Sequence, residues 1–550
     1  MTLLRRGLPW LLLAGLTWLV GYPLLMTLLQ ALGLGAESWG LAPFADLFRR
    51  PDEWQALWRS LWISLASVGL AAAIGIPLGF LFERTEFPGR QLLGALIALP
   101  VALPPLVGVI AFLFLYGESG FISRAVQTVL SLDHAPWRLN GPGAILLVHA
   151  YSMYVYFYLF TRAGLARLDG ALSEAAASLG AGSWSTLRRV TLPLLAPSLA
   201  GAALLTFMTS LASFSAPYIF GGGFRVMTTQ IVFSKLNGED RMAHVETVAL
   251  AAMALLALWL MQKLSPPAAV EGAVRGIAPA RRTFRRPATR IALAVAGYFF
   301  AGLMLLPHAT LILISLVPSG TWTTEAWPPV LNFENYQILA SQPERLVAVW
   351  NSLWMALAAA LVAVILGFLA ARMALVKRGA LGKLLEGAIA LPWAIPGTVF
   401  AVALATTFSV HQPAVGRFVL IGTPWILPLA YLVRNLPMTG RAALAGLGQL
   451  DGALEEASAS LGAGRWRTLR RVTLPLVRPA LAAGASLAFI TGLGDFVTSI
   501  VLYTYETRPI SIEILSSLRL RELGVAGVYG VLLMIAGTAA FVLWGRKEVA

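Results

Sequence analysis

Few residues of this chain combine the types and spacing that chemistry requires. Cysteine is absent, which excludes disulfides, thiolate metal sites and cysteine nucleophiles. A P-loop needs G-x-x-x-x-G-K-[ST], and the one Gly-Lys pair, Gly382-Lys383, is followed by Leu384. The His, Asp and Glu residues form no cluster with metal-ligand spacing. We therefore expect no catalytic residue, no metal and no cofactor on this chain, and charges inside apolar segments become the candidate functional groups.

Asp495 and Arg434 are the main charges of this kind. Asp495 lies in the apolar segment 478–502, and Arg434 lies in the apolar segment 422–441. Ionisable side chains inside a bilayer are costly, and they often line the path of a substrate. Asp495 is therefore a candidate path residue. Two alternatives remain open for it: an ion pair with Arg434, or a position at a helix break near the membrane surface.

The chain contains a long internal repeat. The stretch "SEAAASLGAGSWSTLRRVTLPLLAP" from Ser173 returns as "EEASASLGAGRWRTLRRVTLPLVRP" from Glu455. Between residues 168–200 and 450–482, 26 of 33 positions are identical. Such identity predicts two copies of one structural unit with a pseudo-two-fold axis along the membrane normal and a path between them.

The repeat adds three candidate path residues. At the offset of 282 residues, Asp495 corresponds to Ser213 and Phe496 corresponds to Phe214. The two copies therefore differ where a substrate path would be lined. Ser213, Phe214 and Phe496 join Asp495 and Arg434 as candidates.

The composition predicts a polytopic membrane protein. Of the 550 residues, 58% are hydrophobic and 12% are charged, whereas soluble domains carry about 25% charged residues. Apolar runs of the length that crosses a bilayer recur along the chain. We place twelve spans at residues 8–32, 59–82, 91–116, 141–162, 196–219, 244–264, 291–316, 348–374, 384–410, 422–441, 478–502 and 524–545.

The basic residues predict the orientation. The net charge of +15 reflects Lys and Arg in the loops, and these residues gather on the cytoplasmic side of membrane proteins. Their distribution puts both chain termini and both copies of the repeated stretch in the cytoplasm. We expect a first half at 1–264, a cytoplasmic linker at 265–290 and a second half at 291–550. The six arginines of the linker also suit anionic-lipid binding.

Each repeated stretch is predicted to form two short helices. Asp169 can cap the first helix, and Gly180 and Gly182 end it. Ser183 can cap the second helix, and prolines mark the approach to the next span. A surface helix that merely joins two spans is the plain alternative. That alternative does not explain why two such segments stay alike while the spans diverge, so we expect both copies to dock copies of one partner.

The repeated stretch resembles the cytoplasmic "EAA" loop of ABC importer permeases. Glu174, Ala175 and Ala176 are followed by Gly180, and Glu456 and Ala457 are followed by Gly462, with Ser458 in place of the second alanine. In that family the loop holds a coupling helix that docks on a separate ATPase. The resemblance implies ATPase-coupling roles for Glu174, Ala175, Ala176, Gly180, Glu456, Ala457 and Gly462.

The resemblance covers both halves of the chain. With two such loops in one chain, the sequence is similar to the fused permeases of ferric-iron and thiamine importers. It implies an all-α polytopic fold of two six-helix, type I (MetI-like) permease repeats with about 12 transmembrane helices. It also implies two ABC ATPase subunits that carry ATP and Mg²⁺, a soluble binding protein outside, membrane lipids around the chain and no nucleic acid. Ferric iron is the first substrate expected, and thiamine is the second. An ion-coupled secondary transporter is the alternative class, because twelve spans in two halves suit it as well.

Overall fold

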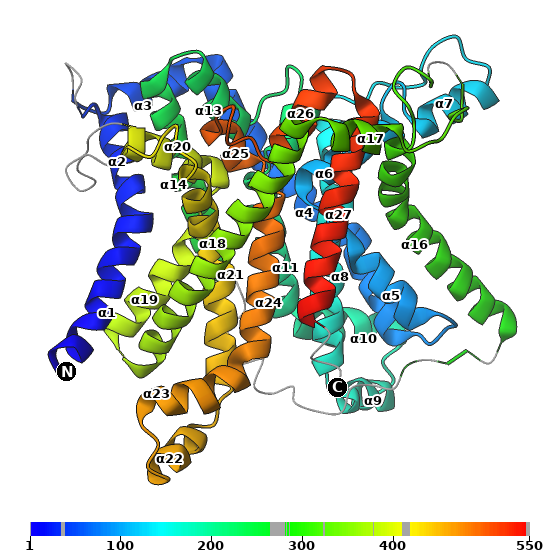
Figure 1. Ribbon diagram of the computed structural model, residues 1–550. Coiled ribbons are helices and arrows are strands. Elements are labelled where there is room, and N and C mark those ends of the chain that lie inside the picture. The colour runs from blue at the N-terminus through cyan, green and yellow to red at the C-terminus, as the bar shows by residue number, and fades with distance from the viewer. Residues whose placement is uncertain are drawn as a thin grey trace.

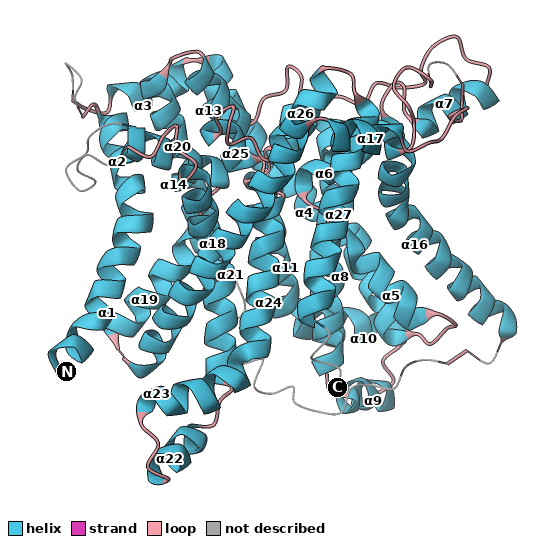
Figure 2. Ribbon diagram, viewed as in Figure 1, coloured by secondary structure: helices cyan, strands magenta, loops and turns pink. Residues whose placement is uncertain are grey.

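The computed structural model describes residues 2–34, 39–264, 281, 283–284, 286–322, 325–377, 379–409 and 419–545. Within these ranges the chain is helical and has no β-strand (Figure 2). This confirms the predicted all-α polytopic fold. Most of the predicted linker, 265–290, lies outside the described residues.

Ten helices of the described residues are long and apolar enough to cross a bilayer. A helix pair bent by 103°, Ala380–Trp393 and Gly397–Ser409, gives an eleventh span. The remaining predicted span, 422–441, forms α21, Ile426–Gly448. α21 is not among the ten helices because Arg434, Asn435 and Arg441 lower its hydropathy.

The first half contains four helices before α5 and α6, then α8, the repeated polar stretch and the last two spans. Its elements are α1 Thr2–Leu16, a π-helical turn Thr17–Gly21, α2 Tyr22–Leu32, α3 Ala42–Arg49, α4 Pro51–Arg84, α5 Arg90–Ala98, a 3₁₀ turn Leu99–Ala102, α6 Pro105–Tyr116, α7 Phe121–Val129, α8 Gly141–Arg167, α9 Gly170–Ser178, α10 Ser183–Thr186, a π-helical turn Leu187–Thr191, α11 Leu192–Leu211, α12 Ser215–Phe220, α13 Met227–Leu236 and α14 Asp240–Leu264.

The second half repeats this order from its own first span onward. Its elements are α16 Pro287–Ser315, α17 Glu334–Ser341, α18 Pro343–Val376, α19 Ala380–Ala390, a 3₁₀ turn Leu391–Trp393, α20 Gly397–Ser409, α21, α22 Gly452–Ser460, α23 Arg465–Thr468, a π-helical turn Leu469–Thr473, α24 Leu474–Leu493, α25 Val497–Leu502, α26 Ile510–Arg519 and α27 Leu523–Gly545.

Three packed helices form the centre of each half. In the first half α4, α8 and α11 pack against one another, and in the second half α18, α21 and α24 do the same. α9 and α22 lie at one end of the molecule, where α1 begins and α27 ends (Figure 1). The opposite end carries α3, α7, α13 and α26 (Figure 1). We call these the loop end and the far end.

The first span of each half packs against the other half. α1 and α2 contact α19 and α20, whereas α16 contacts α5 and α6. Each half therefore packs its first span against the other half. The two sequence repeats do not form two separate bodies. This exchange fixes the halves to each other along the membrane-facing rim.

Glycines at matching positions allow close helix crossings in both halves. A Cβ atom at Gly75 of α4 would lie 2.6 Å from the Cβ of Phe157 on α8. A Cβ atom at Gly367 of α18 would lie 2.8 Å from the backbone nitrogen of Gly440 on α21. Helices in membranes associate mainly through such close backbone approach, since lipid supplies little hydrophobic drive between them.

The crossing of α4 and α8 yields a test. Gly75→Val should destabilise the folded protein by about 1–3 kcal/mol, because the new side chain overlaps α8. Gly69→Val is the matched control on α4, where a Cβ atom meets nothing within 4 Å. The measurement is the thermal unfolding midpoint of each variant in detergent. Equal midpoints for the two variants would contradict the packing role of Gly75.

Candidate functional site

The two polar loops, residues 169–191 and 451–473, have the same local geometry. The Asp169 carboxylate accepts a hydrogen bond from the backbone N–H of Ala171 at 3.0 Å, and Asp451 accepts one from Ala453 at 2.9 Å. Each aspartate thus caps its helix as predicted from the sequence. The helices end at Gly180 and Gly462.

Both glycines adopt the left-handed conformation. The φ angle is +81° at Gly180 and +78° at Gly462. Glycine takes this conformation at little cost, whereas a residue with a side chain is strained there by about 1 kcal/mol. The glycines therefore set the turn that leads into α10 and α23.

Each polar loop exposes an apolar pair to its surroundings. Leu179 is 89% exposed and Leu461 is 88% exposed, while Trp184 and Trp466 are 72% and 71% exposed. Such agreement between the copies means that both loops present one and the same surface. Large apolar side chains are thus left open on two equal faces.

The predicted coupling residues lie on or beside this surface. Glu174 and Glu456 are exposed, and so are Ala175, Ala457, Gly180 and Gly462. Ala176 and its counterpart Ser458 are half-buried against the following helix. The structure thus brings each set of coupling residues together on one short helix and its turn.

The second loop is tied to its half more firmly than the first. Glu455 forms an ion pair with Arg372 of α18 at 3.3 Å and accepts a hydrogen bond from the Thr473 hydroxyl at 2.6 Å. The hydroxyl groups of Ser458 and Thr468 are 2.9 Å apart. The first loop has Ser173 and Ala176 at the positions of Glu455 and Ser458, so it lacks the counterparts of these three interactions.

The predicted path residues Phe214 and Phe496 meet between the halves. Their ring centroids are 5.5 Å apart, although the residues belong to different repeats. Tyr218 stacks on Phe214 at 5.1 Å and contacts Phe496 at 5.9 Å. Phe214 and Phe496 are 1% and 2% exposed. These rings fill the space between the halves where α11 and α24 end.

Asp495 forms an ion pair with Arg434, one of the two alternatives open from the sequence. The Asp495 carboxylate also accepts hydrogen bonds from the backbone N–H of Thr498 at 2.8 Å and from its hydroxyl at 2.5 Å. Asp495 therefore caps α25 and neutralises Arg434. Its side chain is 3% exposed, whereas that of Arg434 is 25% exposed.

Ser213, the counterpart of Asp495, takes part in a neutral network. The His149 ring lies 2.9 Å from the hydroxyl of Ser213 through Nε2 and 2.9 Å from the hydroxyl of Ser67 through Nδ1. Ser210 also contacts Nδ1 at 3.2 Å. Hydroxyls and one buried imidazole thus occupy the place that an ion pair occupies in the other half.

Glu53 and Glu246 are buried polar residues that lie outside the predicted coupling and path sets. Glu246 falls within the predicted span 244–264, and its position there is the signal that could point to it. Glu53 lies just before the predicted span 59–82, so hydropathy gives no such signal. Glu53 lies near the start of α4 and Glu246 near the start of α14, and these helices follow α3 and α13 at the far end (Figure 1).

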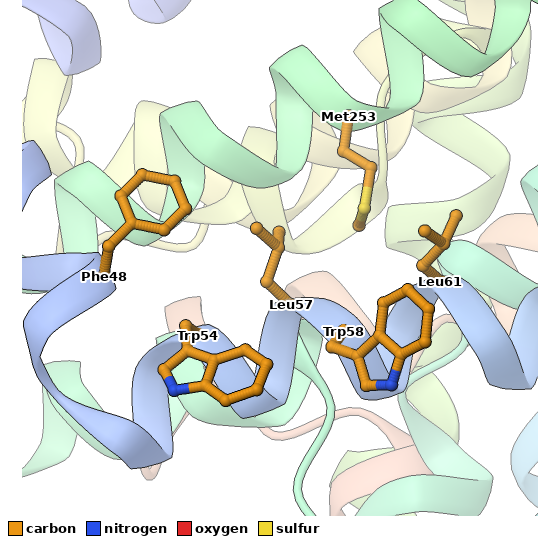
Figure 3. A pocket seen from close by; sticks show the side chains of 6 residues that line it. All are labelled: Phe48, Trp54, Leu57, Trp58, Leu61 and Met253. Carbon is orange, nitrogen blue, oxygen red and sulfur yellow. The ribbon is translucent and has the colours of Figure 1, made fainter.

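An apolar groove runs along the first half between α3, α4 and α14. It has a volume of about 330 Å³ and is lined by Phe48, Trp54, Leu57, Trp58, Leu61 and Met253. Figure 3 shows these side chains facing one another across the groove. The groove has no charged group in its lining.

The chain is similar over its whole length to transport permeases. A probable ABC transporter permease protein of Sinorhizobium fredii, y4fN, is 30% identical over 100% of this chain and 98% of its own. The ferric transport system permease protein FbpB of Actinobacillus pleuropneumoniae is 27% identical over 87% of this chain and 68% of its own. The thiamine transport system permease protein ThiP of Escherichia coli is 28% identical over 87% of both chains.

Fold, repeated loops and relatives define the class: this is a fused permease of an ABC importer. The family model for the binding-protein-dependent transport system inner membrane component matches residues 75–268 and again residues 363–546. The chain belongs to that family. It is a multi-pass inner-membrane transport subunit, and the alternative of an ion-coupled secondary transporter is set aside.

The ion pair of Arg434 and Asp495 yields a second test. Arg434→Ala should destabilise the protein by about 3–5 kcal/mol, because it leaves a buried carboxylate without its cation. Asp495→Asn should cost less, since the amide oxygen can still cap α25 and Arg434 retains access to solvent. Unfolding midpoints in detergent measure both effects.

Arg441→Ala is the control for this test. Arg441 lies on the same helix and is exposed, so its loss should cost less than about 1 kcal/mol. A loss for Arg434→Ala no larger than for Arg441→Ala would show that the ion pair has no structural role.

Proposed function

We propose that this chain forms the path by which an ABC importer moves ferric iron into the cytoplasm, with the energy supplied by two separate ATPase subunits. The observation that carries the proposal is the pair of matching exposed surfaces on α9–α10 and α22–α23. Two equal surfaces at one end of a chain with two-fold internal symmetry suit two copies of one ATPase subunit. The chain itself has no P-loop, so ATP is bound and hydrolysed by those partners.

The loop end is assigned to the cytoplasm. ATP is available there, and the basic residues of the loops favour that side. Both chain termini then face the cytoplasm as well. The far end faces outward and receives the substrate from a soluble binding protein.

The path is assigned to the space between the halves, where Phe214 and Phe496 close it toward the far end. Parting of the halves separates the two rings and opens the path outward. A docked loop transmits ATP-driven closure of the ATPases because the loop and its spans move as one packed unit. In this scheme Ser213, Asp495 and Arg434 act beside the rings, where they hold the breaks that precede α12 and α25.

Ferric iron is proposed as the substrate, and thiamine is the second candidate. The relative FbpB is named as a ferric permease and the relative ThiP as a thiamine permease, and they are similar to this chain to nearly the same degree. Selection between the two is assigned mainly to the binding protein, because the buried centre of the permease offers no cluster of metal ligands among the described residues.

Docking of the ATPase is tested at the glycine turns. Gly462→Val should reduce recovery of the ATPase on the purified permease at least tenfold, because the strained turn displaces Leu461 and Trp466 from the docking surface. Gly464→Ala is the matched control, since the φ angle of Gly464 is −66° and any residue fits there. Equal ATPase recovery with both variants would contradict the proposed docking surface.

Substrate and energy source are tested together in proteoliposomes that contain the whole complex with its binding protein. Labelled ferric iron should accumulate when ATP is supplied on the loop side, and labelled thiamine should not. Gly180→Val or Gly462→Val alone should abolish most uptake, because one half without its motor cannot complete alternating access.

Each alternative outcome of this experiment has a distinct meaning. Uptake of thiamine in place of iron would mean that thiamine is the substrate, and the assignment as an ABC importer would stand. Uptake at half the full rate in each single-loop variant would contradict the joint action of the two loops.

A further inference from the structure

Two glutamates are buried side by side at the far end of the first half. Glu53 in the first turn of α4 is 2% exposed, and Glu246 on α14 is 0% exposed. α13 packs against both helices and supplies one donor to each carboxyl group. Gln230 donates to Oε1 of Glu53 at 3.2 Å, and Ser234 donates to Oε1 of Glu246 at 2.6 Å.

The second oxygen of each carboxyl group has no donor. Oε2 of Glu53 and Oε2 of Glu246 are buried without a hydrogen-bond partner. The two carboxyl groups are nevertheless within hydrogen-bonding reach of each other. Two ionised carboxylates can only accept hydrogen bonds, so this contact repels unless a proton lies between the oxygens.

The equivalent positions in the second half carry residues of balanced charge. The two halves align there because the Ser60 hydroxyl accepts from the backbone N–H of Met227, and the Ser352 hydroxyl accepts from that of Ile510, both at 2.7 Å. On this alignment Arg345 stands at the position of Glu53, and Tyr529 stands at the position of Glu246.

Two acids at this place in the second half, Glu522 and Glu513, each have an arginine partner. Arg345 binds the Glu522 carboxylate at 2.8 Å, and Arg508 binds Glu513 at 3.3 Å. Glu513 occupies the position of Gln230 on the first-half helix α13. The first half therefore has an acid where the second half has a base, and no ion pair of the described residues includes Glu53 or Glu246.

The charged groups around the glutamates are engaged elsewhere. Arg50 pairs with Glu239 at 2.7 Å, and Lys235 pairs with Asp240 at 2.5 Å. Farther along the helices, Asp46 and Arg49 of α3 pair with each other at 3.4 Å, His244 of α14 lies 2.7 Å from the Thr406 hydroxyl of α20, and Arg241 has interactions of its own. The helices α2, α11 and α20, which also pack on α14, contain no charged residue.

We propose that Glu53 and Glu246 form a carboxyl pair that binds one proton between them and so joins the outer ends of α4 and α14. The bound proton turns a repulsive contact into a hydrogen bond. Removal of the proton leaves two negative charges in a buried site, and the helix ends separate. The stability of this part of the permease thus depends on the pH at the far end.

An apolar groove lies next to the carboxyl pair along both helices. Leu57 follows Glu53 by one helical turn, and Met253 follows Glu246 by two turns. Both residues line the apolar groove of Figure 3. The side chains of Leu57 and Met253 offer the carboxyl pair no hydrogen-bond donor. A proton shared between the two carboxyl groups satisfies an oxygen of each.

Infrared spectroscopy of the purified full-length permease tests the proposal. At neutral pH the wild-type protein should show the C=O band of a protonated carboxylic acid, and the band should shift in D₂O. Glu246→Gln and Glu53→Gln should each lose this band, since the amide replaces the protonated partner. Glu513→Gln is the matched control and should retain it, because Glu513 lies outside the carboxyl pair and forms an ion pair with Arg508.

A second measurement covers the case in which a variant does not fold. The folded wild-type chain holds a proton that the unfolded chain releases at neutral pH, so its stability must fall as pH rises. One proton corresponds to a change of about tenfold per pH unit in the unfolding constant. The thermal midpoint of the wild type should therefore fall between about pH 6 and about pH 9, the range above the ordinary pKa of glutamate.

Three results would overturn the proposal. They are the absence of a carboxylic-acid band in the wild type, its persistence in both glutamine variants, and stabilisation by added Ca²⁺ or Mg²⁺ in place of the band. The last result would mean that the two carboxylates hold a metal ion.

Discussion

Backbone N–H and C=O groups cannot remain unbonded in lipid, and this constraint decides where the chain can interrupt its helices. The interruptions fall after α5, α19, α11 and α24, which are matching places in the two halves. They gather between the halves: a Cβ atom at Gly494, in the break before α25, would overlap Pro104, in the break before α6. At these breaks the backbone N–H and C=O groups can find hydrogen-bond partners in the surrounding protein. A path through the same region then has polar groups beside it without exposing them to lipid.

The two halves are alike at the loop end and differ at the centre and the far end, and this pattern follows from what each region must contact. The polar loops keep the same exposed Leu and Trp, so both present the same apolar surface. At the centre, Asp495 and Arg434 in one half replace the serines and His149 of the other. Internal symmetry is therefore preserved at the exposed polar loops and lost at the centre, between the halves.

Sequence periodicity and composition predict most of the helices, the two polar loops and the repeat, because these depend on local patterns. Asp169 and Gly180 are clear examples, since a cap and a left-handed turn need only their neighbours. The contact of Phe214 with Phe496 depends on how the halves meet, which local patterns do not encode, although the repeat offset identifies the pair as equivalent. The exchange of α1–α2 and α16 between halves was beyond sequence reasoning for the same reason. Glu53 and Glu246 become a pair only when α13 brings α4 and α14 together.

Charge balance at the centre bears on how an importer releases its cargo. Asp495 is neutralised by Arg434, and hydroxyls surround His149 in the matching place. A cationic substrate between the halves would therefore meet dipoles and rings rather than a free carboxylate. Tight binding there would slow release, because conduction needs sites weak enough to leave. Weak substrate binding suits a permease that depends on a separate binding protein to capture its substrate. The binding protein then supplies the affinity, and the permease needs only to open in turn to each side of the membrane.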